Sequence, residues 1–171
     1  MTRRHMQGFA LRGAVGIVLF WLLVMAALYW AMDRWQQPRA ARVTAGGELV
    51  VPRHADGHFR VAGSINGEPV MFMVDTGASV VSISEALAQR AGLSGGEPAQ
   101  FHTANGVRTG RMVRAGVIRL QGGLQVENLR VGTGLGLGGG ADDQGLLGQN
   151  FLQHFDVQMD RERMVLRPRS P

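Results

Sequence analysis

One acidic residue stands out because of its neighbours. Asp75 follows the apolar stretch "PVMFMV" and precedes Thr76, Gly77 and Ala78, and a second apolar stretch, "VVSIS", comes shortly after. A buried carboxylate is costly unless it is hydrogen-bonded, paired or protonated, and Gly77 would let backbone N–H groups reach this one. An ordinary Asp-initiated turn is the default interpretation, but a solvated turn needs no apolar flanks. The pattern therefore predicts a buried carboxylate that is available for acid–base chemistry.

Other chemistries find little support in the sequence. There is no Cys, which excludes disulfides, thiolate metal sites and a cysteine nucleophile. His54 and His58 are expected to lie in a loop, and no His-Glu-x-x-His motif exists, so we expect no metal site. Gly134, Gly136 and Gly139 fit a Gly-x-Gly-x-x-Gly pattern, but a strand and a helix do not flank them and Lys is absent. We therefore expect no nucleotide site and no cofactor.

Composition indicates a folded chain without a nucleic-acid partner. Of the 171 residues, 45% are hydrophobic and only 18% are charged, which argues against disorder. The net charge of +5 suggests nucleic acid at first sight, but residues 1–42 hold six Arg and one Asp. From residue 43 onward, twelve Arg balance twelve acidic residues. The excess charge therefore belongs to the N-terminal segment and not to a basic binding face.

An uncharged run of twenty residues occupies positions 13–32, between Arg12 and Asp33. As a helix it would be roughly 30 Å long, which is the thickness of a bilayer core. Tyr29 and Trp30 lie near its far end, where amphipathic rings favour the membrane interface. The run predicts a transmembrane helix. A buried core helix and a signal peptide cleaved after the small residues of "VMA" are the two alternatives.

The flanks of this run suggest how the chain is placed in the membrane. Residues 1–12 are predicted to be a cytoplasmic leader and residues 33–47 a polar tether. Three Arg lie on each side of the run, so the positive-inside rule gives a near tie. The short leader with its free amine favours a cytoplasmic N-terminus. We therefore expect a single-pass inner (cell) membrane protein whose C-terminal domain is periplasmic, that is, extracytoplasmic.

After the tether, short apolar segments alternate with turn signals. Asn66-Gly67 and Asn105-Gly106 suit tight hairpin turns, because both residue types tolerate positive φ. One short helix is expected over residues 84–93, capped by Ser84, and a second within "GLLGQNFLQHF". The remaining segments read as strands: "ELVVPR", "HFRVAGSI", "PVMFMVD", "VVSIS", "AQFHTA", "VRTGRMV", "AGVIRL", "LQVENLRV", "DVQMD" and "RMVLRP". The domain is thus expected to be all-β with one or two short helices.

Three motifs in order resemble a known family. "FMVDTGASVVSIS", the hairpin "FHTANGVRTGR" and "GLLGQNFL" look like the retropepsin-like aspartic proteases of clan AA. The likeness is to single-lobe retroviral enzymes and especially to their bacterial membrane-anchored relatives, and it covers residues 48–168. It implies a single-lobe closed barrel. The N-terminal span and the long loop "GTGLGLGGGADDQ" depart from the retroviral pattern.

The resemblance implies a role for each motif. Asp75 matches the catalytic aspartate, with Thr76, Gly77 and Ala78 supporting its turn; the Thr76 hydroxyl would brace two such turns across a dimer. The flap that closes over substrate would comprise four residues: Thr103, Ala104, Asn105 and Gly106. The hydrophobic-hydrophobic-Gly element beneath the catalytic turn would comprise Leu146, Leu147 and Gly148.

The chemistry that this family uses requires two carboxylates sharing one proton. The chain has one Asp-Thr-Gly, so the second aspartate is expected from a second copy in a two-fold homodimer. The predicted function is therefore a membrane-anchored aspartic endopeptidase that hydrolyses peptide bonds of a protein or peptide substrate. Two alternatives remain: a non-catalytic peptide-binding module of the same fold tethered to the membrane, and a structural membrane protein whose domain only dimerises.

Overall fold

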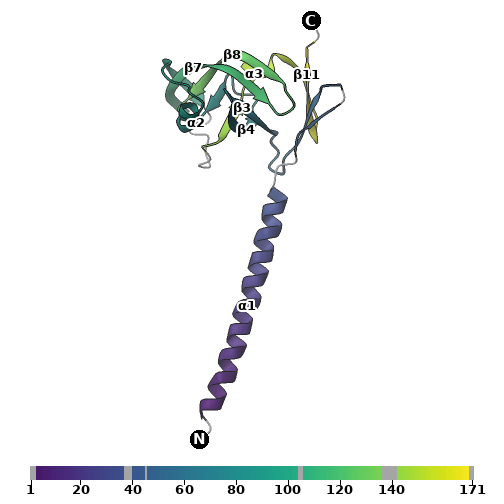
Figure 1. Cartoon of the computed structure of the whole chain (residues 1–171), viewed down its shortest axis with the longest axis vertical. Coiled ribbons are helices and arrows are strands. Elements are labelled where there is room, and N and C mark those ends of the chain that lie inside the picture. Colours follow the sequence, from purple (N-terminus) through teal and green to yellow (C-terminus); the bar gives the residue numbers. More distant parts are fainter. Residues whose placement is uncertain (1–2, 37–39, 45, 104–105, 136–141, 170–171) are drawn as a thin grey trace. The chain divides into compact units, whose positions relative to one another are not determined.

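The computed structural model describes residues 3–36, 40–44, 46–103, 106–135 and 142–169. The chain divides into two compact units, with the boundary between Gln37 and Pro38 (Figure 1). The first unit is one helix, and the second contains the strands and two short helices.

The first unit is helix α1 (Arg3–Gln36), which extends beyond the predicted span at both ends. Its stretch Val15–Arg34 has a mean hydropathy of 2.3, and none of that window is buried against other parts of the chain. The Arg34 guanidinium lies 4.9 Å from the centre of the Trp30 ring. By length and composition, this helix is able to cross a membrane.

The second unit consists of two sheets. Its helices are α2 (Glu85–Arg90) and α3 (Gln149–Leu152). Its strands are β1 (Arg42–Val43), β2 (Leu49–Pro52), β3 (Arg60–Ile65), β4 (Glu68–Val74), β5 (Val81–Ile83), β6 (Glu97–Thr103), β7 (Gly106–Leu120), β8 (Gln125–Thr133), β9 (Gln144–Leu147), β10 (Phe155–Met159) and β11 (Arg163–Pro168).

The larger sheet closes on itself. Its strand order is β3-β4-β9-β5-β8-β7-β6, and β3 also pairs with β7 at Gly63↔Leu120, Ser64↔Arg119 and Ile65↔Ile118. Six strands therefore form a closed ring, to which β6 is added on the outside of β7. The expectation of an all-β closed barrel with one or two short helices, preceded by a helix able to span a membrane, is confirmed.

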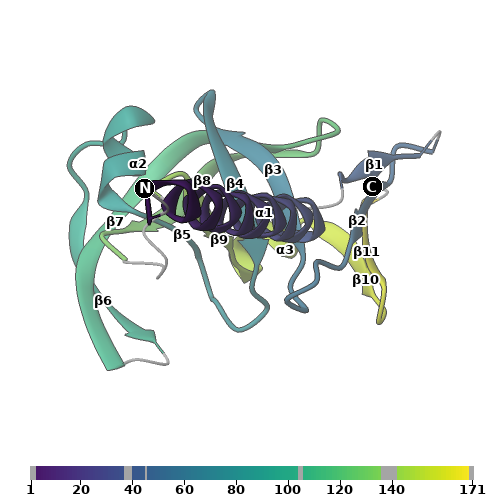
Figure 2. The ribbon, with the colours of Figure 1, turned by 90° about the horizontal axis from the view of Figure 1, so that it is seen from below.

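The smaller sheet has the order β1-β2-β11-β10 and joins the two ends of the second unit. β1 lies in the stretch predicted as a tether. Figure 2 shows the long β6–β7 hairpin at one side of the unit and these four strands at the other. Leu49, Val51, Met164 and Leu166 alternate along β2 and β11, are fully buried and belong to the same hydrophobic core as the buried residues of the larger sheet.

Local sequence explains several of these elements. Asn66 (φ 51°) and Gly67 (φ 91°) both adopt positive φ in the two-residue turn between β3 and β4, as predicted. The Ser84 hydroxyl accepts a hydrogen bond from the Leu87 N–H and caps α2, also as predicted. By contrast, "VRTGRMV" and "AGVIRL", read as two strands, are one continuous strand, β7, because no turn-forming pair separates them.

Candidate functional site

Asp75 lies directly after β4, where the chain leaves the barrel. Its N–H donates to the Leu147 carbonyl (3.2 Å), and one of its carboxylate oxygens accepts a hydrogen bond from the Gly77 N–H (2.8 Å). The backbone therefore reaches the carboxylate. The expectation that Asp75 is buried was wrong: it is only partly buried, whereas Val74 before it is 8% exposed. β4 ends at Val74, so the turn emerges from the core.

Thr76 and Gly77 form the exposed outer part of the turn. The Thr76 carbonyl accepts a hydrogen bond from the Gln149 side chain (3.0 Å). The Thr76 hydroxyl makes no hydrogen bond to any other residue that the structure describes. A solvent-facing hydroxyl beside the Asp75 carboxylate is therefore free to bond to another molecule.

The segment after β9 packs against the Asp75 turn. β9 runs parallel to β4 with Leu147 opposite Val74, and Leu147 is fully buried. A Cβ atom at Gly148 would lie 2.4 Å from the Val80 carbonyl oxygen and 2.9 Å from that of Ala78. Only glycine allows this approach, because real Cβ atoms do not come so close to a backbone oxygen. The sequence element Leu146-Leu147-Gly148 thus lies against the Asp75 turn.

Two amide side chains next to this element were not singled out from the sequence. Gln149 holds the Thr76 carbonyl, as described above. The Asn150 side chain accepts from the Val81 N–H (2.9 Å) and donates to the Arg130 carbonyl (2.8 Å), so it joins β5 to β8. The available signal was two amides directly after Gly148 within an otherwise apolar segment.

The β6–β7 hairpin lies where the resemblance places a flap. Thr103 and Gly106 are paired, and the Thr103 hydroxyl donates to the Gly106 carbonyl (2.8 Å). Ala104 and Asn105 lie outside the described residues. Val107, next in the hairpin, is 57% exposed. At the base of the hairpin, the Arg111 guanidinium bonds to the Glu85 carboxylate of α2 and to the Gly95 carbonyl.

One row of residues crosses five strands beside Asp75. In the ladders, Met73 lies opposite Leu146, Leu146 opposite Ser82, Ser82 opposite Gly132, and Gly132 opposite Met112. Residues opposite one another share a face of the sheet, so this row forms a continuous wall. Met73 shares this face with Asp75, because the two residues are two positions apart.

A charged cluster lies on the other side of β4. The carbonyl of Phe59, the residue before β3, accepts a hydrogen bond from the Val74 N–H (2.9 Å), which brings the preceding loop close to the Asp75 turn. In that loop, desolvation acts to raise the pKa of Asp56, but hydrogen bonds from the His58 N–H, Arg60 and His54 outweigh it. Together with the Arg60 charge, they hold the Asp56 pKa well below its usual range. Asp56 therefore stays ionised across the ordinary pH range.

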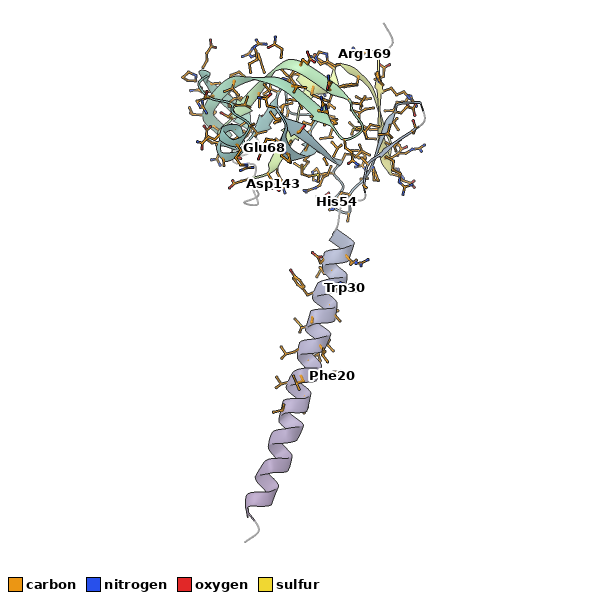
Figure 3. All side chains as sticks on the ribbon, viewed as in Figure 1. Phe20, Trp30, His54, Glu68, Asp143 and Arg169 are labelled. Carbon is orange, nitrogen blue, oxygen red and sulfur yellow. The ribbon has the colours of Figure 1, made fainter. Side chains whose placement is uncertain are left out.

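The remaining candidate groups lie in other surroundings. The Asp142 carbonyl accepts from Ser84 and Arg90, and the Asp143 carbonyl accepts from the Met71 N–H on β4. Figure 3 shows Asp143 on the same side of the unit as Glu68, which is the first residue of β4. Asp75 instead follows Val74, the last residue of β4. Within the described residues, no three His, Asp or Glu side chains are grouped so that they could hold a metal ion.

One motif was missed in the sequence. Gly92-Leu93-Ser94-Gly95-Gly96 fits the Gly-x-Ser-x-Gly pattern of serine hydrolases. Here the pattern follows helix α2 and precedes strand β6. A nucleophilic serine of that class lies between a strand and a following helix. The context is reversed, so Ser94 does not have the setting of such a nucleophile.

The chain is similar to a known protein family, to a solved structure and to two curated proteins. The model of a family described as "gag-polyprotein putative aspartyl protease" matches residues 61–154. A crystal structure of a retropepsin-like aspartic protease from Rickettsia conorii has a TM-score of 0.56 and 25% identity, covering 74% of this chain and 91% of that one. An uncharacterized protein of Rickettsia prowazekii (strain Madrid E) is 26% identical over 177 residues, which span 96% of this chain and 74% of the relative. An uncharacterized protein from the cobV 5' region of Sinorhizobium sp. is 29% identical over 127 residues, 70% of this chain and 52% of that protein.

Proposed function

The chain belongs to the gag-polyprotein aspartyl protease family and has a retropepsin-like fold, and from this premise we propose that it is a membrane-anchored aspartic endopeptidase. Its active site would be built from the Asp75 residues of two chains. The observation that carries this proposal is the Asp75 turn, which is braced from below by Gly148 and Gln149 and exposed on its outer side.

The proposed reaction uses the two Asp75 carboxylates as an acid–base pair. Two like charges that close together cannot both be ionised, so the pair shares one proton, as in aspartic proteases generally. The ionised carboxylate takes a proton from water, whose oxygen attacks the scissile carbonyl carbon, and the protonated one gives its proton to the carbonyl oxygen. The carboxyl group protonated in the first step then gives its proton to the leaving nitrogen as the C–N bond breaks, and the other carboxylate takes a proton from a hydroxyl of the tetrahedral intermediate. Both groups return to their starting state, and no cofactor enters the balance.

The homodimer is proposed because each chain has only one Asp-Thr-Gly turn. The sequence contains a single Asp-Thr-Gly, and this reaction needs two carboxylates. The exposed Thr76 hydroxyl, which has no partner among the described residues of its own chain, supports a contact between two copies at this turn. A two-fold axis through the site would bring the two turns together. The β6–β7 hairpins, with Thr103 to Gly106 at their tips, would then cover the bound peptide.

Helix α1 would anchor the enzyme through residues 13–32, with the second unit on the periplasmic side of the inner membrane. Its apolar stretch and its exposed side chains support the membrane anchor. The proposed domain organisation is a leader (1–12), a membrane span (13–32), a tether (33–47) and a protease domain (48–168). The substrate would therefore be a protein or peptide on that side of the membrane.

The experiment that tests the proposal is cleavage of an unfolded protein by the purified full chain and by its Asp75→Asn variant. We expect peptide-bond hydrolysis by the wild type and loss of at least a hundredfold in the variant, because Asn cannot act as a general base. Circular dichroism of the variant should match the wild type. Cleavage by the variant at near the wild-type rate would contradict the assignment of Asp75. A wild type that binds peptide without cutting it would favour the binding module.

A further inference from the structure

Two arginines face each other on the outer side of the barrel. Arg114 of β7 lies directly opposite Arg130 of β8, and both are exposed. Like charges directly opposite one another in a sheet are destabilising. No described carboxylate forms an ion pair with either of them. The nearest by register is Glu97 of β6, which lies opposite Met112.

Among the described residues, no hydrogen bond joins either arginine side chain to a negatively charged group. The Arg114 guanidinium donates to the carbonyl (2.8 Å) and the side-chain oxygen (3.3 Å) of Asn128, both of which are neutral groups. The Arg130 guanidinium makes no hydrogen bond with any residue in the described part of the chain. A protein that retains such a pair gives up some stability for it, which suggests that an anion binds there.

The pair lies in line with Asp75. Two residues beyond the Met73–Met112 row, Arg130 and Arg114 form a pair on the same face of β8 and β7, and Asp75 lies two residues beyond Met73. Extending the register of the other strands places Gly148, just after β9, and Val80, just before β5, between them in a second row. The contact between the Gly148 backbone and the Val80 carbonyl confirms the middle of this row. Since alternate residues of a strand share a face, both arginines point to the same side of the sheet as the wall beside Asp75.

The side chain of Asn150 fixes this arrangement. It joins the Val81 N–H to the Arg130 carbonyl, so the strand that carries Arg130 is tied to the segment packed under the Asp75 turn. The position of Arg130 relative to the Asp75 turn is therefore set by specific hydrogen bonds and not by a loose loop.

The separation of the two arginines from Asp75 can be expressed as a number of residues along a bound peptide. Neighbouring strands are about 4.8 Å apart, so Arg130 lies about 14 Å and Arg114 about 19 Å from Asp75 along the sheet. An extended peptide advances about 3.3 Å per residue, so a peptide that follows the sheet across these strands from Asp75 would reach the two arginines after about four to six residues.

From these observations we infer that Arg114 and Arg130 are specificity-determining residues that bind an acidic side chain of the substrate, four to six residues from the scissile bond. This inference rests on the proposed protease function. In a two-fold dimer, each end of the peptide meets one arginine pair, so an acidic residue is favoured on both sides of the cleaved bond. The substrate class is a protein with acidic residues flanking an extended, uncharged cleavage segment.

The test uses the full chain and a set of matched peptides. The parent is a peptide that the wild type cleaves, with Gln at positions three to seven on each side of the scissile bond. In each other peptide, one Gln is replaced by Glu. We expect Glu to raise kcat/KM about two- to fivefold at one or two positions among the fourth to sixth, mainly through KM, as for an exposed ion pair. This gain should diminish at high salt.

Variants assign the effect to the arginines. Arg130→Gln and Arg114→Gln should each remove the preference for Glu, so that the ratio of kcat/KM for the Glu and Gln peptides falls to about one. Arg119→Gln is the matched control, because Arg119 is an exposed arginine near the other end of β7, held by Gln125. Loss of the preference in the Arg119 variant as well would show general charge attraction and overturn the inference. So would an equal loss for Glu and Gln peptides, which would indicate a structural role.

A binding measurement separates this inference from the proposed function. The Asp75→Asn chain is titrated with fluorescent Glu and Gln peptides, and anisotropy gives the two Kd values. A preference for Glu that depends on Arg130, without any cleavage by the wild type, would uphold the binding of acidic side chains by the arginines and contradict the protease. Cleavage without a Glu preference at any position would uphold the protease and overturn the inference. Neither cleavage nor preference would overturn both.

Discussion

At the scale of single residues, Gly148 is a position where the fold leaves no room for a side chain. It holds the segment after β9 against the Asp75 turn, with two backbone oxygens within 3 Å of where a side chain would begin. The neighbouring N–H groups of Gln149 and Asn150 donate to the Ala78 and Ser79 carbonyls (2.8 and 3.1 Å). The turn that carries Asp75 is therefore positioned by backbone contacts, which side-chain substitutions elsewhere cannot replace.

We expect Gly148→Ala to destabilise the second unit by about 1–3 kcal/mol, because the added methyl group must displace backbone. Activity should fall more than stability alone explains, since the Asp75 turn moves with this contact. The loss of stability is measured by urea unfolding of the Gly148→Ala, Asp75→Asn double variant against Asp75→Asn alone, because Asp75→Asn prevents self-cleavage. The loss of activity is measured as kcat/KM of the Gly148→Ala single variant. Gly46→Ala is the control, because the nearest atom to its new methyl group is 3.8 Å away. Equal stability of the two variants would contradict the packing described for Gly148.

A second prediction at this scale concerns the effect of Asp56 on the pH dependence of stability. Its pKa in the folded state lies below the ordinary value of 3.8, so the unfolded state binds more protons in acid. Its contribution to stability is therefore complete above about pH 4 and is lost progressively as the pH falls further. Asp56→Asn should be less stable than its parent at pH 7 and should lose less stability between pH 5 and about pH 2. Urea midpoints across that range check this, and parallel curves for the two proteins would show that the cluster contributes nothing.

At the scale of elements, short-range patterns were readable from the sequence and long-range pairings were not. The Asn66-Gly67 turn and the Ser84 cap depend on residues only a few positions apart, so the sequence predicted them. The juxtaposition of Arg114 and Arg130 depends on the register of two long strands, and Asn150 joins segments 20 and 69 residues away. Packing of the whole barrel decides such contacts. The same reason explains why Asp75 was expected inside the core: the sequence shows its apolar flanks but not where β4 ends.

Helix α1 is an element whose role is open to direct measurement. With the proposed topology, protease added to cells with a permeabilised outer layer should digest the second unit and leave the helix in the membrane fraction. A cytoplasmic protein serves as the control for cell integrity. Protection of the second unit would indicate the opposite orientation. Recovery of a soluble, shortened chain would indicate that the helix is removed as a signal peptide.

At the scale of the whole molecule, the central claim is that one active site needs two chains. Each chain supplies one Asp75 turn, in which the Thr76 hydroxyl has no hydrogen-bond partner among the described residues of its own chain. A membrane anchor would raise the local concentration of partners, so the dimer interface itself need not be strong. Activity should accordingly depend on protomer concentration when the chain is diluted in detergent.

Mixing wild-type chains with Asp75→Asn chains tests this claim most directly. After exchange of subunits, only dimers with two Asp75 residues are active, so activity should follow the square of the wild-type fraction. An equal mixture at constant total protein should retain about one quarter of the wild-type activity, and a threefold excess of the variant about one sixteenth. Exchange is confirmed beforehand by pull-down between two differently tagged chains. A decline in direct proportion to the wild-type fraction, with about one half remaining in the equal mixture, would show that each chain carries a complete site and would contradict the account.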